Sequence, residues 1–87
     1  MKNLTMPIIH LNGTSKESLL EGYELAYSAI GDTMRTLQEA APNARDYYPA
    51  PVSYPKAADE HAARLKALAT VREELEQIAR AICNQDR

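Results

Sequence analysis

Apolar residues recur every three or four positions along two long stretches of the chain. In the first stretch they form one stripe made of Leu20, Tyr23, Tyr27, Ile30, Met34, Leu37 and Ala41. In the second, the stripe comprises Ala58, His61, Leu65, Leu68, either Val71 or Arg72, Leu75, Ile78 and Ile82. This spacing is typical of helices that bury one face. The pattern predicts two long helices, over residues 14–41 and 55–83.

Local signals mark the ends of the first helix. Thr14 and Glu17 match the capping box, in which the Thr14 hydroxyl accepts from the backbone N–H of Glu17 and the Glu17 carboxylate accepts from that of Thr14. Pro42 ends the helix, because its ring cannot continue a helical backbone. Gly31 lies in the middle, where we expect one continuous helix with either a bend or a close helix contact.

The predicted connection between the helices, residues 42–54, is rich in proline. Pro42, Pro49 and Pro51 lie within it, and Pro55 follows in the first turn of the second helix, where proline is tolerated. Proline at this density disfavours helix and sheet, so we expect a stiff irregular loop. Helices that reverse direction need only about two to eight connecting residues, and longer loops often carry function.

The first residues of the chain, 1–13, predict an extended N-terminal arm that ends at the turn dipeptide Asn12-Gly13. Pro7 lacks a backbone donor and no second strand-like run is present, which argues against a sheet. The arm is expected either to strap across the helices or to contact another subunit.

These elements predict an all-α fold: a long antiparallel helical hairpin (residues 14–87) with an extended N-terminal arm, assembling into a helix bundle. Two helices that touch along one seam bury only part of each stripe, and chains of this size gain only about 3–5 kcal/mol from a single core. We therefore expect a homo-oligomer. The alternative is a monomer whose arm covers the open groove with Ile8, Ile9 and Leu11.

Composition limits the class of protein. The chain has 87 residues, 45% hydrophobic and 25% charged, which suits one small globular domain. Its net charge of −2 lacks the basic excess of proteins that bind duplex nucleic acid. No apolar run reaches the roughly 18 residues of a membrane span, and no signal-peptide pattern opens the chain, so we expect no membrane association and a cytoplasmic location. Cys83 is the single cysteine, and we expect a buried, unreactive thiol.

The strongest candidate for ligand binding is the centre of the proline-rich loop. Arg45, Asp46, Tyr47 and Tyr48 offer a guanidinium group, a carboxylate and two stackable rings, which suit a phosphate or a base. All five aromatic residues of the chain are tyrosines, a residue type that favours interfaces and ligand platforms over sealed cores. The alternative is that the polar side chains only bond to the loop itself while the tyrosines cover the hairpin end.

Two further clusters can contact a ligand. The first gathers at the start of the first helix, where unpaired backbone N–H groups favour an anion, and consists of His10, Asn12, Gly13 and Thr14, together with Ser15. Capping by Thr14 explains much of this cluster without a ligand. The second is the pair Tyr23 and Arg72, which fall level if the hairpin closes near residue 48. Alternatively, Arg72 extends to water along the bundle.

No catalytic, metal or cofactor site is predicted. The chain offers one cysteine and two separated histidines, without the spacing of any zinc or di-iron motif. His61 on the second stripe is expected to be a hydrogen-bonded interior residue. No nucleophile and base pair stands out, so we expect a protein without enzymatic activity and without a cofactor.

Two motifs carry a resemblance over nearly the whole chain. They are His10-Leu11-Asn12-Gly13-Thr14 and Asn43-Ala44-Arg45-Asp46-Tyr47-Tyr48-Pro49, followed by an alanine-rich charged helix. The chain resembles a recurrent group of small uncharacterised phage and prophage helical proteins. That resemblance implies a phage accessory protein acting in the cytoplasm of a bacterial host, which favours counter-defence, and it assigns no residue a role.

The function expected from these observations is sequestration of a phosphorylated nucleotide signal by a non-enzymatic homo-oligomer. Its binding sites would combine the loop residues with the start of the first helix, since assembly creates pockets that one hairpin lacks. The alternative is a protein-interaction module that docks on a host or virion protein through the tyrosine-rich loop or a helical stripe.

Overall fold

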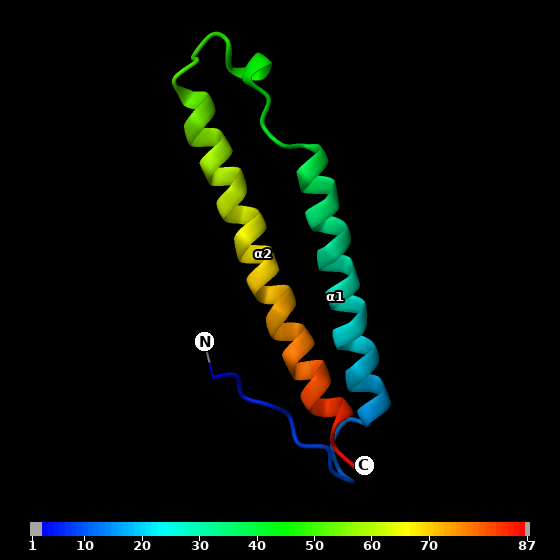
Figure 1. Ribbon diagram of the computed structural model, residues 1–87. Coiled ribbons are helices and arrows are strands. Elements are labelled where there is room, and N and C mark those ends of the chain that lie inside the picture. Colours follow the sequence, from blue (N-terminus) through cyan, green and yellow to red (C-terminus); the bar gives the residue numbers. More distant parts are fainter. Residues whose placement is uncertain (1–2, 87) are drawn as a thin grey trace.

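The computed structural model describes residues 3–86 and confirms the all-helical hairpin (Figure 1). Helix α1 spans Lys16–Glu39, and the longer helix α2 spans Ser53–Cys83 and runs antiparallel to it. A short 3-10 helix, η1, spans Ala44–Tyr47 in the connection, and residues 3–86 contain no strand. Residues 1 and 2 of the predicted arm lie outside the described residues.

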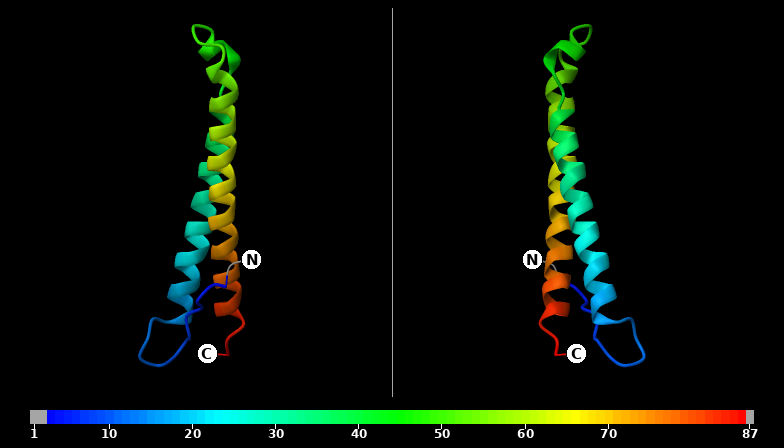
Figure 2. Two further views of the ribbon diagram at one scale, coloured as in Figure 1. Left: turned by 90° about the vertical axis from the view of Figure 1, so that its left-hand side faces the viewer. Right: turned by 90° about the vertical axis from the view of Figure 1, so that its right-hand side faces the viewer.

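The molecule is a thin rod. It measures 61 × 23 × 17 Å, and its radius of gyration is 18.4 Å, whereas a compact chain of this length has a radius of about 12 Å. The views in Figure 2 show that the two helices form a single layer. Each helix therefore has one helical neighbour and leaves much of its surface uncovered.

The seam between the helices follows the predicted stripes. Every predicted position of α1 up to Leu37 is half-buried, while Ala41 lies beyond the end of the helix and is exposed. The sequence leaves open whether Val71 or Arg72 belongs to the stripe of α2. Arg72 is half-buried and Val71 is exposed, so Arg72 is the stripe residue. Among the described residues only Ile9 and Ile82 are buried, at 8% and 0% exposure, so the hairpin has almost no sealed core.

The start of α1 differs from the prediction by one residue. Ser15, not Thr14, is the N-cap, and its hydroxyl accepts from the backbone N–H of Ser18 at 3.1 Å. The capping box that pairs Thr14 with Glu17 is therefore wrong. Threonine and serine are both good N-cap residues, so local preference does not decide between Thr14 and Ser15. With Ser15 as the N-cap, Lys16 lies in the first turn of α1 and donates to the backbone oxygen of Gln85.

The connection between the helices is more ordered than predicted. Helix α1 ends at Glu39 rather than residue 41, because the residue before Pro42 is driven away from helical geometry. The expectation of a loop without helix is wrong for η1, which Asn43 caps by accepting from the backbone N–H of Arg45 at 2.9 Å. Helix α2 begins at Ser53, so Pro55 lies in its first turn.

The register of the hairpin also corrects the sequence prediction. Arg72 lies over the ring of Tyr27 and beside Gly31, about one turn further along α1 than the predicted partner Tyr23. The end of α1 then falls close to His61, so the first turns of α2 extend beyond α1, as Figure 1 shows. The prediction pairs residues at equal distances from the middle of the loop, which assumes that both helices start and end level. Because α2 is longer than α1, that pairing is shifted by about one helical turn.

The N-terminal segment, residues 3–15, is tied to the end of α2. The side-chain amide of Gln85 accepts from the backbone N–H of Ile9 at 2.8 Å and donates to the backbone oxygen of Pro7 at 2.9 Å. In Figure 1 this segment runs beside the last turns of α2, on the side away from α1. The alternative of a lid over the groove is wrong for Ile8 and Leu11, which are 79% and 89% exposed.

The single cysteine, Cys83, is exposed, so the expectation of a buried thiol is wrong. Cys83 is the last residue of α2 and follows Ile82, the last residue of the seam. Within residues 3–86, no helix is long and apolar enough to cross a membrane.

Candidate functional site

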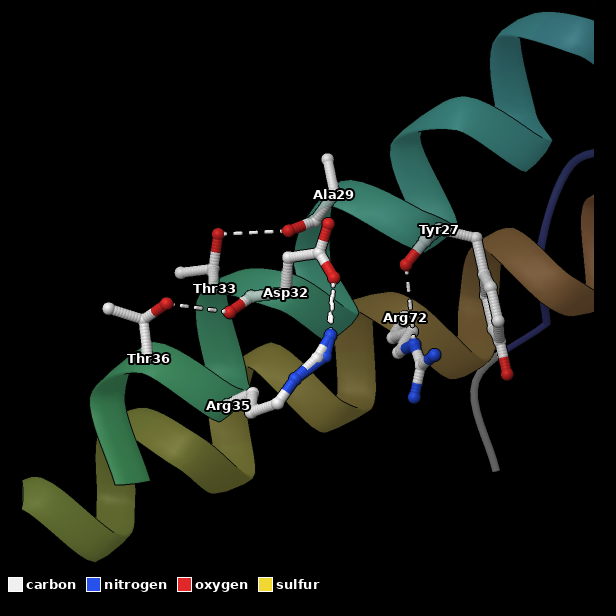
Figure 3. Close-up of polar contacts among 7 residues, drawn as sticks. All are labelled: Tyr27, Ala29, Asp32, Thr33, Arg35, Thr36 and Arg72. Atoms are coloured by element: carbon white, nitrogen blue, oxygen red, sulfur yellow. Dashed lines mark hydrogen bonds and ion pairs between the residues drawn. The ribbon is translucent and has the colours of Figure 1, made fainter. Parts of the chain in front are cut away.

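Arg72 is a half-buried charged side chain that reaches across the seam between the helices. Its Nε–H donates to the backbone oxygen of Tyr27 at 3.3 Å, and its Cζ lies 4.0 Å from the centroid of the Tyr27 ring (Figure 3). A guanidinium group over an aromatic face is held by the quadrupole of the ring. The side chain therefore crosses from α2 to α1 with a fixed position, rather than extending to water.

Gly31 makes this crossing possible. A Cβ atom at position 31 would lie 2.7 Å from Nη2 of Arg72, closer than Cβ atoms come to other atoms, and 3.0 Å from its Cζ, so the guanidinium would have to shift. Helix α1 continues through Gly31 without interruption. Of the two options predicted for this glycine, the structure therefore shows the close helix contact, with the Arg72 guanidinium seated in the space that a side chain would fill.

A shallow polar groove opens beside this contact. It has a volume of about 600 Å³ and is lined by Ser28, Gly31, Asp32, Met34, Arg35, Gln38 and Arg72. Asp32 is paired with Arg35 through a contact of 2.5 Å between Oδ1 and Nη2 (Figure 3). Because this carboxylate is neutralised by its neighbour, the charge of Arg72 is left in excess in the groove.

A second hollow adjoins the first and contains Tyr23. Tyr23 lines it together with Tyr27, Leu75 and Glu76, and the Tyr27 hydroxyl lies 3.4 Å from Oε2 of Glu76. Glu76 also binds Arg80 at 3.1 Å. The predicted pair of Tyr23 and Arg72 is thus replaced by Tyr27 and Arg72, with Tyr23 on the neighbouring turn of α1.

The loop candidates lie at the far end of the rod. Tyr47 is half-buried, and its ring packs against that of Tyr54 with the centroids 6.0 Å apart, while Tyr48 is 68% exposed. The side chains of Arg45 and Asp46 are exposed on η1. The tip therefore presents a guanidinium group, a carboxylate and one free aromatic ring to solvent.

The cluster at the start of α1 lies at the opposite end. His10, Asn12, Gly13 and Thr14 are all exposed. The backbone N–H of Gly13 donates to the backbone oxygen of His10 at 3.2 Å, and the His10 imidazole lies against Gly13, where a Cβ would be 2.8 Å from Nε2. A single chain does not bring this cluster to the tip residues, since the length of the hairpin separates them (Figure 1).

Sequence reasoning did not identify several residues that position these groups. The sequence places Tyr27 in the first stripe and predicts a bend or a close helix contact at Gly31, but it does not pair either residue with Arg72. The signal that could have paired them is the unequal length of the helices. The buried Nε2 of His61 has no hydrogen-bond partner among residues 3–86, which contradicts the expected hydrogen-bonded interior. The same residues include no cluster of three metal-ligating side chains.

No protein-family model, curated protein or solved structure matches this chain. Its function must therefore be argued from its own surfaces.

Proposed function

We propose that this chain is a non-enzymatic, phage-type accessory protein that works as a homo-oligomer in the bacterial cytoplasm and sequesters a phosphorylated nucleotide. The observation that carries the proposal is the scarcity of buried side chains in a single copy. A hairpin with two sealed residues among those described needs a partner surface, and a second copy is always present with the first.

The exposed area supports association. A folded monomer of 9.7 kDa is expected to expose about 5,100 Å², whereas this chain exposes 6619 Å². The difference is about 1,500 Å², and a stable pair of proteins buries roughly 800 Å² on each partner. The surface left open by the rod is thus large enough for a stable interface with a second copy.

The two flanks of the seam differ in character. One flank carries the polar groove beside Arg72. The other flank is mainly apolar: helical spacing places Ala26 and Ile30 of α1 near Val71 and Ile78 of α2, with Glu74 on the same face of α2, and Val71 is 44% exposed. An apolar flank favours contact with another copy, because its burial removes hydrocarbon surface from water. We therefore assign the apolar flank to self-association and leave the polar flank facing solvent.

Association can also unite the two terminal clusters. In an antiparallel pair, the tip of one hairpin lies beside the base of the other, so Arg45 and Tyr48 of one copy come close to His10 and Thr14 of its partner. Such a site would hold a phosphate between a guanidinium group and a helix N-terminus, with Tyr48 free to stack on a base.

Calorimetric titration with a panel of nucleotides tests this proposal. Wild-type protein is expected to bind at least one nucleotide and to lose at least tenfold in affinity on the double substitution Arg45→Ala/Tyr48→Ala. The control is Lys56→Ala, which removes an exposed cation from the nearby first turn of α2. Equal binding by the wild type and the double variant, or no binding by either, would contradict the assignment of the tip.

A second candidate function is a protein-interaction module. The observation that favours it is the exposed apolar surface at the tip, where Val52 is 90% and Tyr48 is 68% exposed. Aromatic and aliphatic side chains of this kind form the centres of protein interfaces. A pull-down from host lysate with wild type and with Val52→Asp distinguishes the two functions: a protein retained by the wild type alone supports the module, and no retained protein counts against it.

A further inference from the structure

We propose that the groove beside Arg72 is a separate phosphate-binding site, formed by one copy of the chain. The inference rests on the proposed function for the class of ligand, a phosphorylated nucleotide, but its location does not depend on the tip residues. The site consists of the Arg72 guanidinium, which contacts the Tyr27 ring and Gly31, and of the polar side chains that line the groove.

Most of the hydrogen-bond donors of the Arg72 side chain are unused. A guanidinium group has five N–H donors, and only the Nε–H of Arg72 is used, on the backbone oxygen of Tyr27. The N–H groups on its two terminal nitrogens have no acceptor among residues 3–86. Their direction is fixed, since the guanidinium lies on the Tyr27 ring and fills the space over Gly31. A pre-positioned fork with free donors suits bidentate recognition of a phosphate.

The remaining groove residues suit the same ligand. Ser28 and Gln38 add a hydroxyl and an amide, and Arg35 adds a second guanidinium group, which also pairs with Asp32. On the other side of Arg72, the neighbouring hollow is lined by the carboxylates of Glu73 and Glu76. An anion is therefore favoured on the Arg35 side, which has one lining carboxylate, paired with Arg35, whereas the other hollow has two, of which Glu76 is paired with Arg80.

The volume of the groove indicates the size of the ligand. About 600 Å³ falls within the range of pockets that hold small molecules, roughly 300–1,000 Å³. It exceeds what a lone phosphate ion fills, so part of the groove is left for a sugar or base. If the apolar flank joins copies, this groove stays accessible in the assembly.

Gly31→Ala tests the site without changing any charge. The new Cβ would displace the Arg72 guanidinium, whose Nη2 lies 2.7 Å away. Gly22→Ala is the matched control: it also adds a methyl group to α1, but nothing lies within 4 Å of it. Binding of adenosine monophosphate, inorganic phosphate and adenosine is measured by NMR titration on the wild type, both glycine variants and Arg45→Ala/Tyr48→Ala.

The expected result is that adenosine monophosphate shifts the amide signals around Gly31 and that Gly31→Ala weakens this binding at least tenfold. Gly22→Ala and the tip variant should retain the shifts around Gly31, since the tip variant removes only the separate site at the tip, and adenosine should bind the groove at least tenfold more weakly than the monophosphate. Loss of binding in the tip variant alone would overturn the groove site and leave the proposed function standing. Absence of binding to every protein would overturn both. A change of assembly mass in Gly31→Ala, with nucleotide binding intact, would overturn the site and indicate that the Arg72 contact supports association instead.

Discussion

Gln85 is predicted to be the residue that holds the N-terminal segment on the hairpin. Its side-chain amide both accepts from Ile9 N–H and donates to the backbone oxygen of Pro7, as a neighbouring strand would do. Pro7 has no N–H of its own, so its oxygen is the only backbone group it can offer. Truncation to alanine removes both bonds and leaves the helix backbone intact.

The two hydrogen bonds of Gln85 set the expected loss of docking free energy in the alanine variant. A hydrogen bond of this kind contributes about 1 kcal/mol net, so the pair contributes about 2 kcal/mol. That free energy corresponds to a factor of about 30 in the ratio of docked to undocked segment. Ile9, which is only 8% exposed, then becomes accessible to water more often.

Hydrogen exchange at the Ile9 amide measures this effect directly. Gln85→Ala should accelerate its exchange by about 30-fold, the factor expected from two lost bonds. Gln85→Glu is the graded control, since the carboxylate still accepts from Ile9 but cannot donate to Pro7, and its effect should be intermediate. Exchange at Ile9 that is as slow in Gln85→Ala as in the wild type would refute the reasoning.

Three further predictions concern stability and reactivity. Gly22→Ala should raise the free energy of unfolding by about 1 kcal/mol in urea denaturation through helix propensity, whereas Gly31→Ala should gain little, because the displaced Arg72 loses its contacts with Tyr27. His61→Leu should raise the melting temperature, since removing a buried polar atom without a partner recovers about 1 kcal/mol; a lower melting temperature would show that the ring has an unseen role. Cys83, which is exposed, should react with a thiol reagent in the native protein as fast as in urea, and slow labelling would indicate that another copy covers it.

The helices themselves were predictable because their signal is local. Residues three and four positions apart share a helix face, so the stripes containing Ile30 and Leu68 identify both helices and the side that each buries. Pro42 likewise limits α1 through its own ring and through the residue before it. These effects involve neighbours in sequence and need no tertiary information.

The details that define the candidate site depend on contacts between distant parts of the chain. Thr14 and Ser15 are equally good caps, and a local rule cannot choose between them. The partner of Arg72 depends on how far α2 extends past α1, which the loop length alone does not determine. The role of Gln85 could not be found from a pattern either, because a single polar residue after a helix carries no periodic signal.

The central claim is that this hairpin works as an assembly of copies, and native mass spectrometry of protein purified from a bacterial host tests it most directly. The account predicts a defined multiple of the 9.7 kDa chain, carrying a retained phosphorylated small molecule. A bare monomer of 9.7 kDa at every concentration, with no retained ligand, would contradict it.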